Sequence, residues 1–535
     1  MAERRRKFWG WGYEDQGPNP EQQKHLAERM AKRFGLGALE ITRPPKESEL
    51  ELRAPRVSPP DSLKEICAAS PYERVLHSYG RDFRDLVRIF RRDFSNPCDL
   101  VAYPRDEADV ARVLEWCVGA RLAAVPFGGG SSVVGGVEPP ARGDYRGAVS
   151  IDLTRLGKVL EVDKVSRAAR IQAGVLGPAL DDQLRTHGYT IRHFPQSFEF
   201  SSLGGWIATR SGGHFATNYT HIDDFVESLR IVTPTGTIES RRLPGSGAGP
   251  SPDRMFIGSE GILGVITEAW MRLQDRPKFR AGASVTFKDI FAAAEAVRII
   301  AQSALFPANC RVLDPGEALN SGAGSGDEAV LVLAFESADH PLEPWMKRAA
   351  EICAAHGGKV PDNAIQTRTD ADATHGGAAG AWRNAFLNAP YLMDTVAGLG
   401  MVSNTFETAI TWDRFADFHR QMMECATRAV TRVCGKGSVT CRFTHVYPDG
   451  PAPYYTVLAP GKKNSQIEQW DEIKAEVSDL LIKLGGTITH HHAVGRYHRP
   501  WYDRQRPDGF ARALRAAKRE LDPHAILNPG VLIDP

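Results

Sequence analysis

The sequence predicts an α+β protein made of two domains in succession. Three observations lead to this prediction: strand-like and helix-like runs alternate between residues 96 and 276, three glycine- and serine-rich segments interrupt them, and a second series of strands and helices begins at residue 277. The chain has 535 residues, which is too long for one hydrophobic core at roughly 100–200 residues per domain.

The composition excludes several classes of protein. Hydrophobic residues make up 42% and charged residues 24% of the chain, and 66 basic against 65 acidic residues give a net charge of +1. Nucleic-acid-binding proteins usually carry a clear basic excess, so we expect no nucleic-acid partner. No apolar run approaches the roughly 18–20 residues that span a bilayer, and none follows the basic N-terminal residues, so we expect no secretory signal.

The eight cysteines are scattered and form no CxxC pair. This spacing indicates reduced thiols and a cytoplasmic protein, and no neighbouring motif supports a catalytic cysteine. The run Arg4–Lys7 is basic. We expect it to be a solvated tail, with a contact to a membrane surface as the alternative.

Residues 1–95 are expected to form a helical N-terminal segment. Ser62–Ala68 and Pro71–Arg92 carry apolar residues at helical spacing. Trp9–Tyr13 (WGWGY) is too aromatic for a free tail, so we expect it to dock on the main body.

Residues 96–276 are expected to form the first domain. Asp106–Gly119 has the apolar stripe of an amphipathic helix. Pro234–Gly236 is expected to turn between two strands, and Leu243–Pro252, rich in Gly, Ser and Pro, to be a loop. The strands are expected at Leu100–Tyr103, Ala123–Phe127, Ala148–Leu153, Ala168–Ala173, Leu229–Thr233 and Thr237–Ser240.

Residues 277–455 are expected to form the second α+β domain, and residues 456–535 a C-terminal segment that completes this domain and the active site. Gly322–Gly326 and Asp362–Ala379 are expected to be loops. The strands are expected at Ser284–Phe287, Cys310–Leu313, Ala329–Phe335 and Asn404–Thr411, and the helices at Lys288–Ser303 and Leu342–Ala355.

The first glycine segment, Pro126–Ser132, follows a predicted strand and reads PFGGGSS. Its three glycines allow backbone N–H groups to approach a diphosphate without a clash from Cβ, and consecutive N–H groups form a nest that binds an anion. Such turns also occur without a ligand, so this segment alone leaves both interpretations open. The GxGxxG spacing of a Rossmann turn and the Gly-Lys-Ser/Thr of a Walker motif are absent.

Two further segments strengthen the phosphate interpretation. The second glycine segment, Phe200–Gly213 (FSSLGGWIATRSGG), is expected to lead into a short helix, and the third, Phe256–Thr267 (FIGSEGILGVIT), to end in a strand. Three such loops in one domain indicate a long ligand that threads between them. FAD, with two phosphates and two aromatic ring systems, fits this demand.

In combination, PFGGGSSVVGG, SSLGGWIATRSGG and GSEGILGVIT resemble the FAD-binding domain of the vanillyl-alcohol oxidase superfamily, and more narrowly that of the alkyldihydroxyacetonephosphate synthases. The resemblance implies a two-subdomain FAD-binding domain of the vanillyl-alcohol oxidase type, an α+β substrate (cap) domain and a helical N-terminal segment. The likeness covers nearly the whole chain, including WGWGY (9–13), EFSSLGGW (199–206), IDDFV (222–226), VTPTG (232–236), FET (406–408), TCR (440–442), HHHAVG (490–495) and the closing residues 522–529.

The resemblance implies that FAD is bound noncovalently, because the first glycine segment lacks the His or Cys that usually carries a covalent link. The implied cofactor contacts are Phe127, Gly128, Gly129, Gly130, Ser131, Ser132, Val133, Gln196, Ser197, Phe198, Glu199, Phe200, Ser201, Ser202, Thr209, Arg210, Ser211, Gly212, Glu260, Gly261, Ile262, Leu263, Gly264, Val265 and Ile266.

The resemblance also implies a redox-neutral exchange, in which a fatty alcohol replaces the acyl group of acyl-dihydroxyacetone phosphate and flavin N5 acts as the nucleophile. We therefore expect a small lipid-like substrate, and we keep open a peripheral membrane contact and a homodimer. The alternative is an FAD-dependent oxidoreductase of the 2-hydroxy-acid (D-lactate or glycolate) dehydrogenase class. A flavin-free binding protein is not expected, because all three loops are intact.

The resemblance assigns the acid/base role to Tyr454. Its ordinary pKa of about 10 must be lowered, or its proton must pass to a partner. A core position is the alternative, and Tyr455 is the neighbour with which it could be confused. His490, His491 and His492 are expected at the active site, although in a strand at most two could line one pocket. No metal is expected, because no cysteine or carboxylate lies nearby in the sequence.

Arg311 matches a family arginine that holds the substrate or orders the flavin, and a cation with several donors suits a phosphorylated ketone; a surface salt bridge is the alternative. His193 matches a family histidine near the flavin, with a structural turn histidine as the alternative. Met393 stands where the synthases carry an arginine, and methionine cannot replace its charge. Arg383, which is nearby in the sequence, could supply the missing positive charge instead. Ala493 replaces a family glycine.

Overall fold

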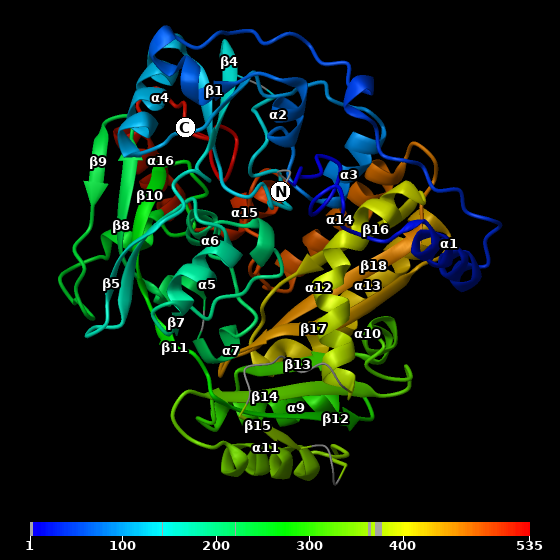
Figure 1. Cartoon of the computed structure of the whole chain (residues 1–535). Helices are drawn as coiled ribbons and strands as arrows, with labels where there is room; N and C mark the ends of the chain where they lie inside the picture. Colours follow the sequence, from blue (N-terminus) through cyan, green and yellow to red (C-terminus); the bar gives the residue numbers. More distant parts are fainter. Residues whose placement is uncertain (1–3, 142, 220, 362–364, 370–376, 535) are drawn as a thin grey trace.

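The fold is built around three main sheets in two domains. The computed structural model describes residues 4–141, 143–219, 221–361, 365–369 and 377–534. In Figure 1 the two sheets of the first domain occupy the upper left, and the seven-stranded sheet of the second domain crosses the lower right. The predicted α+β class is therefore confirmed.

The first sheet leads into the first glycine segment. Its order is β1-β2-β4-β3, with β2, β4 and β3 parallel and β1 antiparallel. β3 (Leu122–Phe127) is nearly all buried, because α4 (Glu107–Ala120) packs against it and residues 526–528 pair with its free edge. The other strands are β1 (Cys67–Ala68), β2 (Leu100–Ala102) and β4 (Gly147–Asp152).

The second sheet is antiparallel, in the order β5-β6-β10-β8-β9. α6 (Leu203–Thr209), which follows the start of the second glycine segment, packs Trp206 and Ile207 into its core. The remaining elements are β5 (Val159–Asp163), β6 (Ala168–Gln172), β8 (Val226–Thr233), β9 (Gly236–Glu239), β10 (Val265–Arg272), β7 (Tyr189–Thr190), β11 (Gln274–Asp275), α5 (Gly177–Arg185), α7 (Ala216–Tyr219) and α8 (Pro252–Phe256).

The cap domain is an antiparallel sheet in the order β15-β12-β14-β13-β17-β18-β16. Alternate residues of each strand point to opposite faces. On β17, Cys441 and Phe443 enter the core beneath the helices, whereas Thr440, Arg442 and Thr444 face a cavity. The strands are β12 (Phe279–Phe287), β13 (Asn309–Leu313), β14 (Ala329–Ser337), β15 (Gln366–Arg368), β16 (Met401–Glu407), β17 (Ser438–Val446) and β18 (Pro451–Pro460).

Four helices supply most of the cap core: α9 (Ile290–Gln302), α11 (Glu343–Ala355), α13 (Trp412–Cys434) and α14 (Gln466–Lys483). α10 (Pro315–Ser321) follows β13, and α12 (Gly377–Gly398) runs along the cap sheet and contacts β16 and the helix at Phe83–Phe90 of the N-terminal segment (Figure 1). Two expectations were wrong in part. β16 ends at Glu407 rather than Thr411, and the expected loop at 362–379 contains β15 and the start of α12. Positions 362–364 and 370–376 of that loop lie outside the described residues.

The N-terminal segment contains α1 (Pro20–Phe34), α2 (Pro71–Leu76) and α3 (Phe83–Phe90). The expected continuous helix over 71–92 is wrong, because the chain bends between α2 and α3. Gly80 there passes so close to the first glycine segment that a Cβ would lie 2.1 Å from the Ser132 oxygen. Residues 61–66 form a 3₁₀ turn that leads into β1. Trp11 is buried, so WGWGY does dock on the main body.

The basic run at the N-terminus is not the solvated tail that we expected. Lys7 is buried, and its Nζ lies 2.9 Å from Asp394 Oδ2 on α12. Arg6 donates a hydrogen bond to the carbonyl oxygen of Gly129 at 2.5 Å. These contacts fix the start of the described chain against the first glycine segment.

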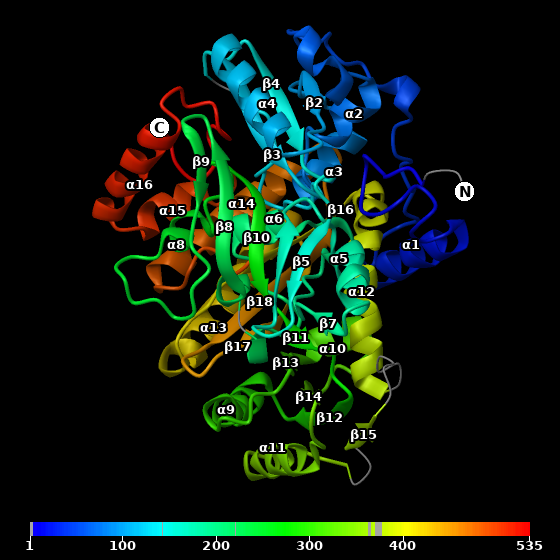
Figure 2. The ribbon, with the colours of Figure 1, turned by 60° about the vertical axis from the view of Figure 1, so that its left-hand side comes forward.

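The C-terminal residues divide between the two domains. β18 continues to Pro460, so the expected boundary after residue 455 lies inside a strand. α14 belongs to the cap core, whereas residues 531–533 and parts of α15 (Arg499–Gln505) and α16 (Asp508–Leu521) pack on the second sheet, beside which Figure 2 shows α16. Among the described residues, no helix has the length and apolar character that a membrane crossing requires.

Candidate active site

A cavity of about 1040 Å³ lies where the two domains meet. The glycine segments of the first domain form one side, and the polar face of the cap sheet forms the other. Its volume is at the upper end of the usual range for ligand sites, roughly 300–1,000 Å³, which suits a cofactor and a substrate together.

The first two glycine segments touch at their backbones. A Cβ on Gly128 would lie 2.1 Å from Ser202 Oγ, and one on Gly129 would lie 1.6 Å from the Phe200 oxygen. The third segment joins them through Asn528, whose Nδ2 donates to the carbonyl oxygens of Glu260 (2.8 Å) and Gly136 (3.0 Å). The three loops therefore converge around one elongated space, as a dinucleotide requires.

Most of the predicted cofactor contacts line this cavity. They are Phe127, Gly128, Gly129, Gly130, Ser131, Ser132, Val133, Gln196, Ser197, Ser201, Ser202, Thr209, Ser211, Gly212, Glu260, Gly261, Gly264 and Ile266.

Seven predicted contacts do not line the cavity. Ile262, Leu263 and Val265 are core residues, as is Phe200, which also meets the ring of Tyr13. Phe198 stacks on Trp206, Glu199 accepts a hydrogen bond from Tyr391, and Arg210 pairs with Asp223. These seven residues contact other parts of the protein around the loops and do not line the cavity.

Arg81 supplies positive charge beside the first glycine segment, and no sequence motif pointed to this role. Its backbone N–H donates to the Ser132 oxygen at 2.7 Å, and its buried guanidinium lines the cavity. The guanidinium donates to carbonyl oxygens of Gly80 and Lys7. Burial is the main cause that lowers the pKa of Arg81 to about 9, and the nearby charge of Arg6 is the second. A buried cation of this kind favours an anion nearby.

Arg311 projects from β13 into the cavity. Its side chain stacks on Trp382, with the guanidinium carbon 4.4 Å from the ring centroid. Nε and Nη1 are buried and have no hydrogen-bond partner among the described residues. Burial is the main cause that lowers the pKa of Arg311 to about 9, and the nearby charge of Arg442 is the second. The surface salt bridge is therefore the wrong alternative, and Arg311 has donors available for an anionic ligand.

Tyr454 on β18 faces the cavity, whereas Tyr455 faces the core and stacks on Phe406 at 4.6 Å. The guanidinium of Arg442 lies 4.0 Å from the centroid of the Tyr454 ring. Burial raises the pKa of Tyr454, although Arg442 and a hydrogen bond with Thr405 act in the opposite direction. In the free protein the phenol is therefore protonated, and it needs a partner to act as a base.

His490, His491 and His492 form a turn, not a strand. Their three backbone N–H groups donate to Glu407 Oε1 at 3.0, 3.0 and 2.9 Å. Glu407 is the last residue of β16 and is fully enclosed. Burial alone would raise its pKa, but the imidazole of His491, whose Nδ1 lies 2.8 Å from Glu407 Oε2, holds the pKa of this carboxyl well below its ordinary value.

The three rings of this turn point to different places. His491 and His492 line the cavity near Tyr454, with ring centroids 6.0 and 5.5 Å from it. His490 points away, and its Nε2 lies 3.0 Å from Tyr447 Oη. Burial lowers the pKa of His492 to about 3 and that of His490 well below its ordinary value, so both rings are neutral.

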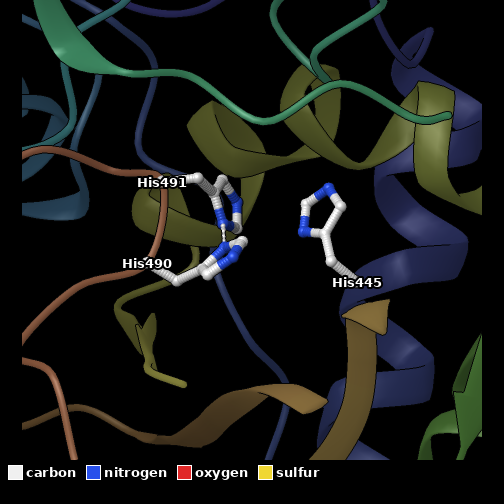
Figure 3. Close-up of side chains that lie close together, drawn as sticks. All are labelled: His445, His490 and His491. Carbon is white, nitrogen blue, oxygen red and sulfur yellow. Dashed lines mark hydrogen bonds between the residues drawn. The ribbon is translucent and has the colours of Figure 1, made fainter. Parts of the chain in front are cut away.

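His445 faces the pair formed by His490 and His491, and the ligand atoms of these three residues lie within 4.8 Å of one another (Figure 3). Glu407, a carboxylate distant in sequence, lies 2.8 Å from His491 Nδ1. His490 Nδ1 is 3.1 Å from His491 Nδ1 and its Nε2 is bonded to Tyr447, so its nitrogens are already engaged. We interpret the group as a hydrogen-bonded relay, and the absence of a metal stays a prediction.

Three further residues bear on the expectations from sequence. His193 is buried outside the cavity, with Nε2 2.8 Å from Ser211 Oγ, and burial lowers its pKa to about 3; it positions Ser211 from behind. Met393 lines the cavity and packs on the cap core. Arg383 is not one of the residues that line it, so it does not restore a charge there.

Comparison with known proteins agrees with this geometry. The family model described as "FAD binding domain" matches residues 98–241, and the model described as "FAD linked oxidases, C-terminal domain" matches residues 276–532. The chain is therefore an FAD-binding protein with the two-domain architecture predicted from its sequence.

Named relatives narrow the family. The chain is 31% identical over 490 residues to an alkyldihydroxyacetonephosphate synthase from Dictyostelium discoideum, which covers 89% of this chain and 79% of the relative. It is 27% identical to the glycolate oxidase subunit GlcD of Bacillus subtilis, covering 81% of this chain and 88% of that protein. A solved alkyldihydroxyacetonephosphate synthase structure superposes with a TM-score of 0.80 at 25% identity, covering 98% of both chains. The chain belongs to the alkyldihydroxyacetonephosphate synthase family of FAD-dependent enzymes.

Proposed function

We propose that this enzyme exchanges the acyl group of acyl-dihydroxyacetone phosphate for a fatty alcohol, the ether-forming step of ether-lipid synthesis. The observation that carries the proposal is that Tyr454 and Arg311 line one cavity together with a group of apolar side chains, here called the apolar arm, and that Arg311 Nε and Nη1 have no hydrogen-bond partner among the described residues. Leu26, Met30, Met393, Val396 and Leu458 form that arm.

The residues present fit FAD. Gly128 and Gly129 leave no room for a Cβ between the first two glycine segments, and Arg81 adds a cation beside the segment predicted to hold the phosphates. FAD supplies, when bound, a nucleophilic and electron-accepting ring nitrogen. We propose that it is held without a covalent bond.

Side chains of the protein bind the substrate, transfer its proton and stabilise the base. Arg311 binds the phosphate of the ketone substrate, because its free donors suit phosphate oxygens. Tyr454 exchanges a proton with the carbon that carries the acyl ester, and His491 and His492 lie where they can relay that proton. Arg442, paired with Glu317, stabilises the phenolate form of Tyr454. The apolar arm takes the fatty chains and excludes water.

The second candidate is an FAD-dependent dehydrogenase for a small 2-hydroxy acid. Arg311 would also suit a carboxylate, and the similarity to a glycolate oxidase subunit favours this alternative. The apolar arm weighs against it, because a short hydroxy acid has no chain to fill the space.

The deciding experiment supplies the purified holoenzyme with acyl-dihydroxyacetone phosphate and a fatty alcohol. Release of fatty acid and formation of the ether product, without uptake of oxygen, would support the exchange. Bleaching of the flavin by D-lactate or glycolate, with no fatty-acid release, would support the dehydrogenase. In the Tyr454→Phe variant we expect the exchange rate to fall by at least about 10²-fold, with FAD content unchanged; full activity would remove Tyr454 from its role.

We further propose a cytoplasmic homodimer that meets a membrane surface through α1. Arg29 and Arg33 are exposed on this helix and line the cavity, and their positive charge is suited to anionic lipid. The homodimer rests on the family resemblance. Sedimentation with anionic and neutral vesicles tests the contact, and light scattering tests the assembly state.

A further inference from the structure

Lys474 is a second cation in the cavity without a partner. It projects from α14, is 9% exposed and lines the cavity. Its ammonium makes no hydrogen bond or ion pair within the part of the chain that the structure describes, and it lies 6.0 Å from the centroid of the Trp470 ring. A buried charge without a counter-ion is costly, which favours an anionic ligand at this point.

The neighbouring carboxylates are already engaged. Asp82 caps α3 and accepts hydrogen bonds from the Arg84 backbone and from Asn404 Nδ2, both at 3.1 Å. Glu407 accepts the N–H groups of the histidine turn. Neither is bonded to Lys474. His492 and His498 line the same part of the cavity, and burial holds the pKa of each below its ordinary value, so they add no competing charge.

Lys474 and Arg311 lie at different positions across the width of the cap sheet. Arg311 is on β13, whereas α14 packs against β16. β17 and β18 lie between these strands, so three interstrand spacings of about 4.8 Å separate them by roughly 14 Å. Arg442 and Tyr454 occupy the strands in between. The proposed acid/base residue therefore lies between two separate cationic positions.

We propose that Lys474 forms a carboxylate subsite that receives the fatty-acid anion released during the exchange. This inference rests on the proposed function. In that reaction the bond between the ketone's terminal carbon and the acyl oxygen breaks, and its electron pair leaves with the oxygen as a carboxylate. The alcohol oxygen forms a new bond to the same carbon, and the alcohol proton leaves through the enzyme base to solvent.

The two cations match the two anionic groups of the reaction. The phosphate stays bound from start to finish, and a planar guanidinium with several donors suits it. The carboxylate is created and then released, and the compact ammonium of a lysine suits one group that must leave. Burial lowers the pKa of Lys474 to about 8, so its charge is still present at neutral pH. The incoming alcohol is neutral and gains nothing from this charge.

The test compares two ligands with the same chain, decanoate and decanol, titrated into the holoenzyme while the flavin absorbance is followed. In Lys474→Met we expect decanoate to bind at least tenfold more weakly and decanol to bind as in the wild type. Lys474→Arg should restore most of the decanoate affinity. Lys483→Met, on an exposed lysine of the same helix, is the matched control and should change neither.

Glycerol 3-phosphate separates the two cations. We expect Arg311→Met to weaken its binding and Lys474→Met to leave it unchanged. Unchanged decanoate affinity in Lys474→Met, or a loss of glycerol 3-phosphate instead, would overturn the carboxylate subsite while leaving the exchange reaction standing. If wild-type holoenzyme binds neither decanoate nor decanol, the proposed function itself fails.

Discussion

Replacing Gly129 by alanine would force the first glycine segment away from the second. The added Cβ would lie 1.6 Å from the Phe200 oxygen and 2.9 Å from Ser201 Cα. Both are backbone atoms, so no side-chain rotation relieves the contact, and the loops must separate by more than 1 Å, roughly the shortfall from an ordinary carbon–oxygen contact. Gly129 also accepts the hydrogen bond from Arg6, which would be lost with the shift.

The expected loss is in cofactor affinity rather than in folding. A hydrogen bond to a charged group contributes about 1.5–3 kcal/mol. If the shift removes two bonds between the loop and the FAD phosphates, binding weakens by about 3–6 kcal/mol, which corresponds to roughly 10²–10⁴-fold in Kd.

The assay is FAD content per protein after gel filtration, followed by titration of the apoprotein with FAD. Gly119→Ala is the matched control, because a Cβ at that helical position meets nothing within 4 Å; it should keep its cofactor. If Gly129→Ala retains FAD with wild-type affinity and a wild-type circular dichroism spectrum, the claim that these two loops clasp the cofactor is refuted.

Four further predictions follow from the site. Glu407→Gln should lower the free energy of unfolding by about 3 kcal/mol, because the N–H groups of the histidine turn lose a charged acceptor; a urea transition within error of wild type would contradict this. Burial raises the pKa of Asp314 from 3.8 to about 7, so its contribution to stability is full below about pH 4 and is lost as the pH rises through 7. Asp314→Asn should therefore show a flatter decline in stability over that range, measured by thermal melts, and an unchanged slope would count against it. Acid precipitation should release all the FAD into the supernatant; yellow colour that stays with the pellet would indicate a covalent link. Dialysis against EDTA should leave activity unchanged, and an activity loss that zinc restores would instead make the His445, His490 and His491 group a metal site.

The sequence was most informative where the chemistry is local. The glycine segments indicate their own backbone geometry, so the cofactor, the domain type and most of the residues that line the cavity beside these segments could be predicted from consecutive residues. Within each segment, however, the alternation of facing and non-facing residues was not visible. Ser201 faces the cavity and Phe200 does not, because tertiary packing decides which side of a loop is covered.

Charged groups that act through burial were the residues that sequence reasoning missed. Arg81 and Lys474 resemble ordinary solvated residues in the sequence, and Glu407 lies in the FET motif without an assigned role; the significance of all three depends on partners distant along the chain. Arg442 was quoted within a family motif but received no role. His193 was a candidate because it precedes the second glycine segment, yet it lies outside the cavity and contacts Ser211 from behind. Spacing alone cannot distinguish a ring that faces a ligand from one that supports a loop.

The hydrogen bonds from Asn528 to Gly136, just after the first glycine segment, and to Glu260 of the third have a consequence for the order in which the site is assembled. Asn528 and Gly136 are 392 positions apart, and the entire cap is synthesised between them. When synthesis of the two sheets of the first domain is complete, the hydrogen bonds from Asn528 to the loops at Gly136 and Glu260 have therefore not yet formed. The hydrogen bonds that join these loops form only after residue 528 has been synthesised and has returned to strand β3.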